Sequence, residues 1–539
     1  MTGNEILART LKDHGVEVIF FLMGGPMIDC ENACGQQEIR MIDVRHEQAA
    51  AMMANAYSRL RRRPAVCMAC SGPGATNLVT GVANASVDSA PVVAIGGSTP
   101  VSQSGMGAFQ ETDQVAVFRP ITRWAERCYD PRRIPELVAT AFRHAFGSRP
   151  GPVYLDMPGD VLYREVPDDQ VRWTAAPGGR HRPQGDPALV ERAVGLIAAS
   201  ERPVVISGSG VLWAEAEPEL RALVEQAKIP FYTTPQGRGA IPEDHPLSFL
   251  GARSAAWRDA DLVVLAATRQ NYVVGYTRPP RVNPRAKLIQ IDIDPAEIGR
   301  NRTPDVGITG DAKAVLAQLI AAGSGRLRPE RRAGWISGLA GEDEEKRAEL
   351  EKRMSSGATP IHPLRLCKEV RDFLPRGAVL CVDGQEILNY ARSAIPFYAP
   401  HSLNSGPYGC MGVGLPFGLG AKAAMPDALV VVLHGDGSFG LNAMEMDTAL
   451  RHRLPVICII SNNGGWTATD RPKTGRDLGF TRYDLMFGAI GCHAEYVEDP
   501  GQIRPALERA AASGTPAVVN VITDPTARAQ TARYADYST

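Results

Sequence analysis

Short apolar runs alternate with segments of helical periodicity along the whole chain. Examples are PAVCMAC at 64–70, ADLVVLAATR at 260–269 and ALVVVLHGDG at 428–437. These runs lack the polar–apolar alternation of a half-exposed strand, and continuous runs are typical of parallel strands that are covered on both faces. Because the runs alternate with helical segments, the pattern predicts βαβ units.

Two stretches interrupt this alternation. Residues 173–187 (WTAAPGGRHRPQGDP) are rich in Gly, Pro and Arg, and residues 323–363 contain the charged segment GEDEEKRAELEKR, which predicts a solvent-exposed helix. We therefore expect an α/β protein of three tandem doubly wound parallel-sheet domains, at 1–180, 185–340 and 355–539. Ligands of such sheets bind at the carboxyl ends of the strands, where several Gly-rich turns of this chain fall.

Composition and charge argue against several classes of partner. Hydrophobic residues make up 44% of the chain and charged residues 22%, and the net charge of −1 gives no electrostatic reason to expect nucleic acid or an anionic membrane. The first fifteen residues predict an amphipathic helix and not a signal peptide. No apolar run reaches the roughly 20 residues of a membrane span. We expect a cytoplasmic enzyme.

The ten cysteines are scattered through apolar segments. Cys67 and Cys70 form a CxxC motif inside a predicted buried strand, but no second CxxC follows at the spacing of a zinc ribbon. We therefore expect small buried thiols in a reducing compartment.

The most specific chemical signal is a GDG motif followed, one crossover later, by NN. Gly435, Asp436 and Gly437 end one predicted strand, and Asn463 follows the next. The carboxyl ends of neighbouring parallel strands share one sheet edge, so Asp436 and Asn463 are expected side by side. A carboxylate and an amide oxygen suit Mg²⁺, which usually completes its shell with phosphate oxygens. Gly437 and the helix opening at Ser438 would let the backbone approach a phosphate.

This pair of motifs resembles the signature of thiamine diphosphate (ThDP) enzymes of the acetolactate synthase-like superfamily. Five further blocks are similar to those of the family and stand in the same order: RHEQAAAMMANAYSR at 45–59, SGPGATNLVTGVANA at 71–85, GAFQETDQ at 107–114, IDIDPAEIGRN at 291–301 and GCMGVGLPFGLGAKAA at 409–424. The resemblance covers essentially the whole chain. It implies that Asp436, Asn463 and the backbone carbonyl of Gly465 hold Mg²⁺, and that the central domain binds a nucleotide.

The resemblance also implies how the cofactor is activated. Met411 matches the residue that supports the bent cofactor, and the Gly409 carbonyl and Met411 N–H match the groups that hydrogen-bond its pyrimidine. Glu47 matches the catalytic glutamate that shares a proton with pyrimidine N1′. Gln385 matches a position near the diphosphate. Glu386 departs from the His or small polar residue often found there, which leaves its role open.

Two features of the stretch around Glu47 carry further implications. In the family this glutamate and the diphosphate site belong to different subunits, which implies a homodimer or homotetramer with active sites at the subunit interface. His46, directly before Glu47, is either a proton relay or a structural residue, and the sequence does not choose between them.

The middle segment indicates a branch of the family. FLGARSAAWRDADLVVLAATRQNY, at 249–272, resembles the 2-hydroxyacyl-CoA lyase and oxalyl-CoA decarboxylase branch, which binds ADP or a coenzyme A (CoA) nucleotide here, whereas FAD-containing acetolactate synthases carry an HG block. The resemblance implies Arg269 for a phosphate, Asp292 and Asp311 for ribose or adenine, and Gly208 and Gly210 for close backbone approach. A vestigial nucleotide fold is the alternative.

The segment FQETDQ indicates the substrate. Oxalyl-CoA decarboxylases carry YEE here, and Phe109 with the neutral Gln110 fits an uncharged hydroxyacyl carbon better than a second carboxylate. Leu388, Trp466 and Phe109 would form an apolar wall around the carbonyl product, which suits a branched substrate such as 2-hydroxyisobutyryl-CoA.

The end of the chain carries arginines near aromatic residues. We expect either a lid over the CoA arm or a frayed tail, and the residues concerned are Arg528, Arg533, Tyr534 and Tyr537.

The sequence thus predicts a ThDP- and Mg²⁺-dependent lyase. It would cleave the C1–C2 bond of a 2-hydroxyacyl-CoA to formyl-CoA and an aldehyde or ketone. The alternatives are an oxalyl-CoA decarboxylase, an acetolactate synthase-like carboligase that acts on 2-keto acids, and a non-catalytic nucleotide-binding protein that kept the fold.

Overall fold

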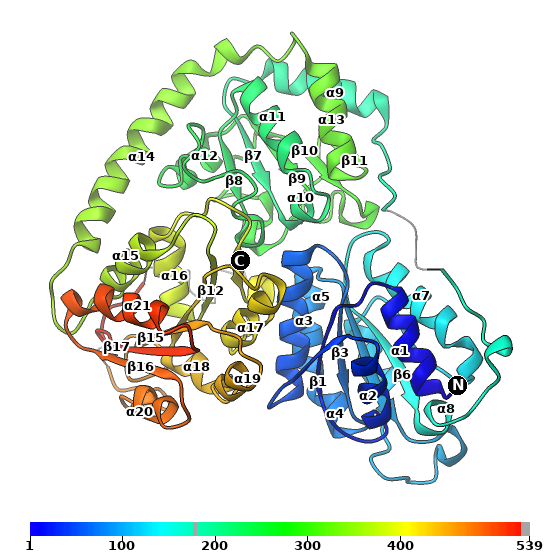
Figure 1. The fold of residues 1–539 in the computed structure, drawn as a ribbon. Helices are drawn as coiled ribbons and strands as arrows, with labels where there is room; N and C mark the ends of the chain where they lie inside the picture. The colour runs from blue at the N-terminus through cyan, green and yellow to red at the C-terminus, as the bar shows by residue number, and fades with distance from the viewer. Residues whose placement is uncertain (176–179, 470, 530–539) are drawn as a thin grey trace.

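Three parallel β-sheets, each covered by helices, make up the computed structural model, which describes residues 1–175, 180–469 and 471–529 (Figure 1). The N-terminal sheet has the order β2-β1-β3-β4-β6-β5, the central sheet β11-β10-β9-β7-β8 and the C-terminal sheet β13-β12-β14-β15-β17-β16. All strand pairs in these sheets are parallel. The predicted fold class is confirmed, and the domain limits 1–180, 185–340 and 355–539 stay a prediction.

The strands are short and mostly buried. In the N-terminal domain they are β1 Val18–Leu22, β2 Arg40–Asp43, β3 Ala65–Ala69, β4 Val92–Ser98, β5 Ala125–Arg127 and β6 Val153–Pro158. In the central domain they are β7 Pro203–Ser207, β8 Phe231–Thr233, β9 Leu262–Ala266, β10 Lys287–Asp292 and β11 Val306–Thr309. In the C-terminal domain they are β12 Val379–Asp383, β13 Ser402–Asn404, β14 Val430–Gly435, β15 Ile457–Asn462, β16 His493–Val497 and β17 Ala517–Ile522.

Helices connect these strands. Those of the N-terminal domain are α1 Gly3–Asp13, α2 Ile28–Gln36, α3 Glu47–Arg61, α4 Pro73–Asn77, α5 Val79–Asp88, α6 Gln114–Phe118, α7 Ile134–Phe146 and α8 Gly159–Leu162. Those of the central domain are α9 Pro187–Ala199, α10 Ser209–Trp213, α11 Glu217–Ala227, α12 Arg253–Asp259 and α13 Ala312–Gly323. Those of the C-terminal domain are α15 Pro363–Phe373, α16 Gln385–Ala394, α17 Gly414–Ala424, α18 Asp436–Asn442, α19 Glu445–Arg451, α20 Tyr483–Gly488 and α21 Ile503–Ala512.

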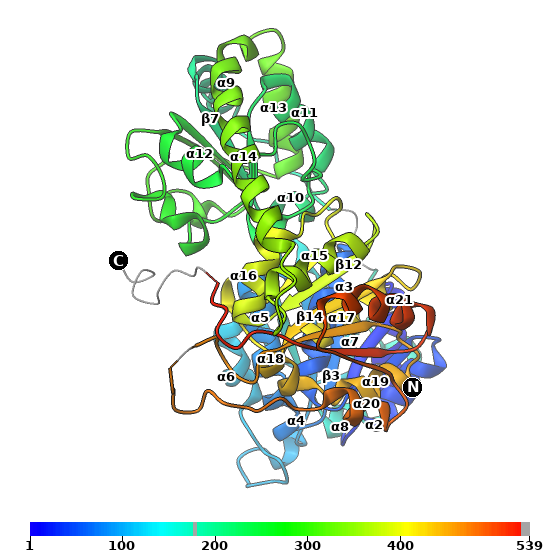
Figure 2. The same ribbon diagram turned by 90° about the vertical axis from the view of Figure 1, so that its left-hand side faces the viewer.

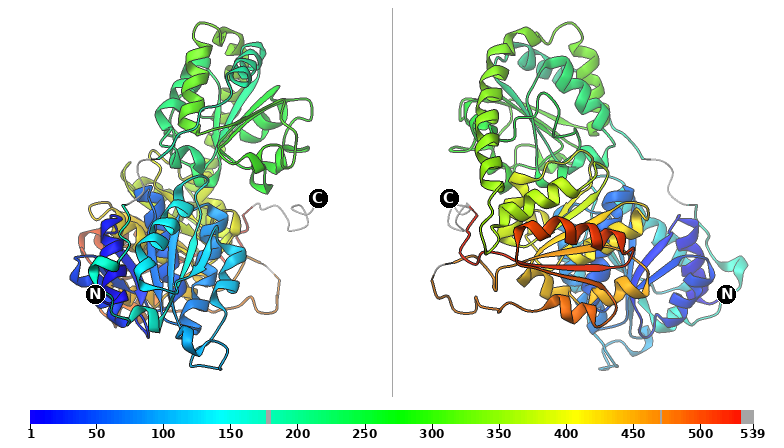
Figure 3. Two further views of the ribbon diagram at one scale, coloured as in Figure 1. Left: turned by 90° about the vertical axis from the view of Figure 1, so that its right-hand side faces the viewer. Right: turned by 60° about the vertical axis from the view of Figure 1, so that its left-hand side comes forward.

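The long charged helix α14, Ala333–Met354, links the central domain to the C-terminal domain along the outside of the molecule (Figure 2). Most of its residues are exposed, as the charged segment predicted. The N-terminal and C-terminal domains lie side by side below the central domain (Figure 3). In the described part of the chain, no helix is both long enough and apolar enough to cross a bilayer.

Small residues let the N-terminal and C-terminal domains approach closely through α3 and α17. A Cβ added at Gly420 of α17 would lie 2.3 Å from the carbonyl oxygen of Met53 in α3. On the other side of α3, a Cβ at Gly81 of α5 would lie 2.6 Å from the Cβ of Ala51. The Ala and Met residues of α3 are fully buried, because the helix is packed between two others and its own sheet.

This packing predicts that one methyl group added at Gly420 destabilises the folded protein. Gly420→Ala should lower the free energy of unfolding by about 1 to 3 kcal/mol, because the new atom collides with backbone that cannot move aside. Gly338→Ala in α14 is the matched control, since no atom lies within 4 Å of its added Cβ. It should be neutral or stabilising by up to about 1 kcal/mol. Thermal or urea unfolding of the two variants compares them, and equal effects would contradict the predicted clash.

Candidate active site

Three oxygen atoms converge where β14 and β15 end. The two strands are parallel neighbours, so Asp436, at the start of α18, and Asn463, after β15, emerge at the same sheet edge. The Asn463 amide oxygen lies 3.2 Å from Asp436 Oδ1 and 2.7 Å from the Gly465 carbonyl oxygen. The structure thus brings the three predicted metal ligands together.

The spacing of these oxygens fits a hard cation. Adjacent ligands of an octahedral Mg²⁺ lie about 3.0 Å apart when each metal–oxygen distance is about 2.1 Å. Without a cation the three oxygens repel one another, and a turned Asn463 amide would donate to the other two instead. The other oxygen of Asp436, Oδ2, is buried and has no hydrogen-bond partner in the described residues. Those residues hold no group of three or more His, Cys, Asp or Glu side chains that would suit a metal elsewhere.

Arg476, which the sequence did not indicate, stabilises the loop after β15 that carries Asn463 and Gly465. The buried guanidinium of Arg476 donates to the backbone carbonyls of Asn463 (3.1 Å), Gly464 (3.3 Å) and Thr467 (2.8 Å). A residue that binds backbone carbonyls carries no motif, so only the loop geometry reveals it.

A buried carboxylate shapes the turn that carries Met411. Asp383, the last residue of β12, is fully buried and accepts the Gly414 N–H at 2.9 Å. Burial raises the pKa of Asp383 to about 6, against the effect of the hydrogen bonds from this turn. Gly409 and Gly412 both adopt positive φ, +69° and +86°, and no atom lies within 4 Å of a Cβ added at Gly409. A side chain at Gly409 would therefore point into open space.

The two residues predicted to bind phosphate, Gly437 and Ser438, differ in which of their groups remain available to a ligand. A Cβ at Gly437 would lie 2.7 Å from the ring of Trp466, so only glycine lets this ring lie against the turn. The Ser438 hydroxyl lies 3.0 Å from the carbonyl oxygens of both Asp383 and Gly435. Because this hydroxyl already hydrogen-bonds to the protein, only the backbone N–H groups of the turn are available to a diphosphate.

Glu47 opens α3 and is 6% exposed. Asn77 Nδ2 donates to its Oε2 at 2.9 Å, and a Cβ added at Gly74 would lie 3.3 Å from its Oε1. Both contacts lie within the N-terminal domain. In the described part of the chain, no hydrogen bond joins Glu47 to Asp436 or Asn463.

The structure assigns contacts to the two residues whose roles the sequence left open. His46 is the N-cap of α3, where its Nδ1 accepts the Gln48 N–H at 3.2 Å, which is a structural role. Glu386 accepts the N–H of Ala529 at 2.8 Å and so ties the C-terminal segment to α16. Gln385, the first residue of α16, is exposed.

Within one chain the predicted apolar wall is not assembled. Phe109 is 84% exposed and belongs to the N-terminal domain, whereas Leu388 and Trp466 are half-buried in the C-terminal domain. Gln110 has a φ of +59°, and its side-chain oxygen accepts a hydrogen bond from Ser71 at 2.5 Å. The loop therefore presents Phe109 to solvent.

A cavity of about 1170 Å³ lies where the three domains meet, and four of the five predicted nucleotide residues line it: Gly210, Arg269, Asp292 and Asp311. Gly208 lies directly behind, against Thr268. Several of these residues already have protein partners. Asp311 caps α13 by accepting the Lys313 N–H, and Asp292 accepts the Asp294 N–H.

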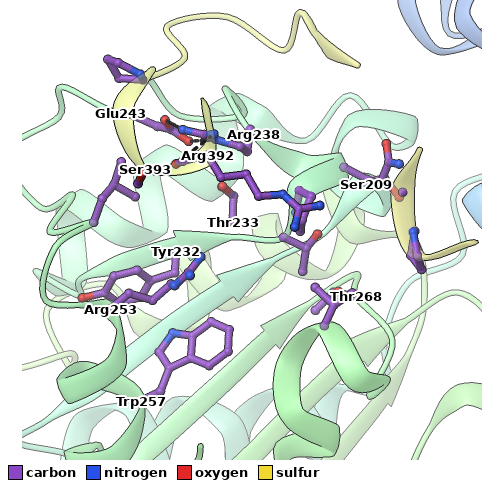
Figure 4. A pocket seen from close by; sticks show the side chains of 18 of the residues that line it. Ser209, Tyr232, Thr233, Arg238, Glu243, Arg253, Trp257, Thr268, Arg392 and Ser393 are labelled. Atoms are coloured by element: carbon purple, nitrogen blue, oxygen red, sulfur yellow. Dashed lines mark hydrogen bonds and ion pairs between the residues drawn. The ribbon is translucent and has the colours of Figure 1, made fainter. Parts of the chain in front are cut away.

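A second region of this cavity was not predicted. Tyr232, Arg253 and Trp257 lie together there (Figure 4). The Arg253 guanidinium lies 5.9 Å from the centre of the Trp257 ring. In the described residues it makes no hydrogen bond or ion pair, and the residue is exposed. The protein atoms crowded around Arg253 and the charges of Arg238 and Arg281 lower the pKa of its guanidinium, although the side chain is open to the cavity. Tyr232 Oη and Trp257 Nε1 are also buried without partners. Of these three side chains, Arg253 is the one whose donors are open to an anion in the cavity.

The predicted lid falls mostly outside the described residues. Arg528 is exposed near the end of the described chain. Arg533, Tyr534 and Tyr537 lie outside the described residues.

Comparison with known proteins agrees with this geometry. The chain matches the Thiamine pyrophosphate enzyme N-terminal TPP binding domain at residues 1–117, the central domain at 190–319 and the C-terminal TPP binding domain at 387–521. An acetolactate synthase large subunit of Mycobacterium tuberculosis is 37% identical over 97% of this chain and 96% of its own length. The 2-hydroxyacyl-CoA lyases of Homo sapiens and Arabidopsis thaliana are each 31% identical over 98% of this chain, and over 95% and 97% of their own lengths. The resemblance noted in the sequence is confirmed, and the chain belongs to the thiamine diphosphate-dependent enzymes.

Proposed function

We propose that this enzyme cleaves the C1–C2 bond of a 2-hydroxyacyl-CoA and releases formyl-CoA with an aldehyde or a ketone. The observation that carries the proposal is the cationic region of the central cavity. Arg253 is unpaired in the described residues and its side chain is open to this cavity, and the phosphates of CoA match the fork of a guanidinium.

The same cavity connects this region with α16. Its lining includes Asn389, Arg392 and Ser393, and Figure 4 draws the last two beside the Arg238–Glu243 pair. Gln385 begins the same helix. A CoA whose phosphates lie against Arg253 would therefore have a route along α16 for its pantetheine arm. The nucleotide residues Gly208, Gly210, Arg269, Asp292 and Asp311 would hold the adenosine part, or a resident ADP.

The remaining roles follow from the chemistry of the residues. Thiamine diphosphate, when bound, supplies the carbanion and the electron sink. Asp436, Asn463 and the Gly465 carbonyl would hold Mg²⁺ against the diphosphate. Glu47 would hold a proton at its carboxyl group beside the pyrimidine nitrogen, and Asn77 would orient that carboxyl group.

The substrate end would be bounded by apolar side chains. Phe109, Leu388 and Trp466 would exclude water from the reacting carbon, and Gln110 would donate to its oxygen. As C1–C2 breaks, the hydroxyl group loses its proton and the carbon that bears it leaves as the carbonyl product. C1 keeps the electron pair of the broken bond, takes up one proton and leaves with its thioester as formyl-CoA. We favour a branched substrate such as 2-hydroxyisobutyryl-CoA, which would give acetone.

An acetolactate synthase-like carboligase acting on 2-keto acids is the second candidate, because the Mycobacterium tuberculosis relative is 37% identical. The unpaired Arg253 favours the CoA substrate, since a 2-keto acid would leave that region of the cavity unused. The oxalyl-CoA decarboxylase alternative would use the same cavity and differ only at the reacting carbon.

We also propose a homodimer or homotetramer, in the cytoplasm, with active sites between subunits. Large apolar side chains on both domains support a partner surface: Phe109 is 84% exposed, Leu441 is 49% exposed and Leu485 is 62% exposed. A second subunit would cover such a surface and bring Glu47 to a metal site.

Three substrates separate the candidates. With ThDP and Mg²⁺ present, 2-hydroxyisobutyryl-CoA should give acetone and formyl-CoA in equal amounts, while oxalyl-CoA and pyruvate should remain unchanged. Chromatography of the acyl-CoAs with an assay of the ketone measures this. Carbon dioxide from oxalyl-CoA would favour the decarboxylase, acetolactate from pyruvate would favour the carboligase, and absence of formyl-CoA from every hydroxyacyl-CoA would refute the lyase.

Loss of Arg253 should weaken substrate binding selectively. Arg253→Ala should raise KM for the acyl-CoA about 10- to 100-fold, the worth of a charge-assisted hydrogen bond to phosphate, with little change in kcat. Arg221→Ala is the control, because Arg221 lies on the surface of α11 and pairs only with Glu225 in the described residues. An unchanged KM for Arg253→Ala would remove this region from the CoA site.

The proposed metal site predicts how Mn²⁺ binding changes on substitution and with pH. Asp436→Asn should abolish Mn²⁺ binding measured by electron paramagnetic resonance, whereas Asp427→Asn, at the exposed turn before β14, should not. Burial raises the pKa of Asp436 to about 6. Below that pH a proton competes with the metal, so apparent affinity should fall by about tenfold per pH unit, and it should be flat above pH 7. Retained Mn²⁺ binding by Asp436→Asn would contradict the site.

A further inference from the structure

A buried carboxylate of the C-terminal domain accepts hydrogen bonds from the backbone directly before Glu47. Glu445, the first residue of α19, is 1% exposed. Its Oε1 accepts the N–H groups of Arg45 at 3.0 Å and of His46 at 3.1 Å, and its Oε2 accepts the Thr448 hydroxyl at 2.6 Å. These N–H groups lie 400 and 399 positions from Glu445 in the sequence.

A second contact holds the backbone directly after Glu47. Gln48 Nε2 donates to Asn442 Oδ1 at 2.9 Å, and Asn442 Nδ2 donates to the Gly412 carbonyl at 2.7 Å. Asn442 is the last residue of α18, the helix that begins with Asp436. Glu47 therefore stands between two attachments to the helix pair α18–α19, and that pair also carries a metal ligand and holds the turn after Met411.

We propose that Glu445 is a positioning residue for Glu47, acting with Asn442 to fix the carboxyl group that activates the cofactor. The inference rests on the role proposed for Glu47. A carboxylate that accepts two successive N–H groups fixes the position of that peptide segment, and charge-assisted bonds of this kind are about twice as strong as neutral ones.

The contacts of Glu445 with Arg45 and His46 are not needed to cap α3 or to pack it. The cap of α3 is already provided by His46 Nδ1, and the contact of α3 with α17 is made farther along, at Met53 and Gly420. Glu445 adds neither a helix cap nor apolar contact area to α3. What it does fix is the start of the helix, where Glu47 stands, and proton sharing with a ring nitrogen tolerates little displacement.

The test follows the C2 proton of bound cofactor, because its exchange with D₂O reports activation without any substrate. Holoenzyme is mixed with D₂O, quenched with acid at set times and analysed by NMR. Glu445→Ala should slow exchange by about 10- to 100-fold, the cost of a displacement of about 1 Å. The isosteric Glu445→Gln, which keeps one acceptor oxygen, should recover most of the rate. Affinity for ThDP with Mg²⁺, measured by calorimetry, should stay close to wild type in both.

Controls separate this inference from the proposed function. Glu47→Gln should lose exchange outright, and Asp447→Asn, which removes a neighbouring carboxylate of α19 that pairs with Arg45, should keep the wild-type rate. If Glu445→Ala does not fold, Asn442→Ala tests the second attachment and should slow exchange in the same way.

Wild-type exchange in folded Glu445 variants, with exchange lost in Glu47→Gln, would overturn the positioning role alone. The positioning role would also be overturned if Glu445→Ala only lowers the unfolding temperature. Wild-type exchange in Glu47→Gln would overturn both the positioning role and the function proposed for Glu47.

Discussion

The close contact between α3 and α17 is the constraint on which the rest of the molecule depends. Gly420 brings the backbones of the two helices to a distance that no other residue would allow. The start of α3 carries Glu47, and the start of α17 follows the Met411 turn. Because each helix moves as one element, the contact near the middle of both helices fixes where the Glu47 end and the Met411 end lie. Small residues in α3 are thus part of the site's geometry, although none of them touches a ligand.

The two halves of the site are organised by different physical means. The metal half is made of oxygen atoms forced together by the ends of β14 and β15 and held by Arg476 on backbone carbonyls. The activating half is a single carboxyl group, oriented by Asn77 and presented at the end of a helix. The proposed dimer would join the two halves across a subunit interface, and the exposed apolar side chains on both domains support such an interface. The central cavity adds a third part, where Arg253 offers charge to an anion.

The sequence predicted most of the fold because buried parallel strands give short, continuous apolar runs. It held no signal for β5 and β13, which have three residues each and lie at sheet edges. Asp436, Asn463 and Glu47 could be found because their spacing is fixed by strand ends and helix starts.

Other residues could not be found in this way. Asp383, Arg476 and Glu445 act on backbone groups, in one case 400 positions away, and such contacts leave no local pattern. For His46 the sequence left a proton relay and a structural role open, and the structure shows a helix cap.

The central claim is that one chain supplies Glu47 and another supplies the metal site. Two inactive variants, Glu47→Gln and Asp436→Asn, test it directly when they are mixed, dissociated and reassembled. In a mixed dimer, one of the two sites would combine an intact Glu47 with an intact Asp436. Random assembly of equal amounts should then restore about a quarter of wild-type turnover. If the mixture stays as inactive as its components although mixed dimers form, both residues serve the same site from one chain, which would contradict the claim.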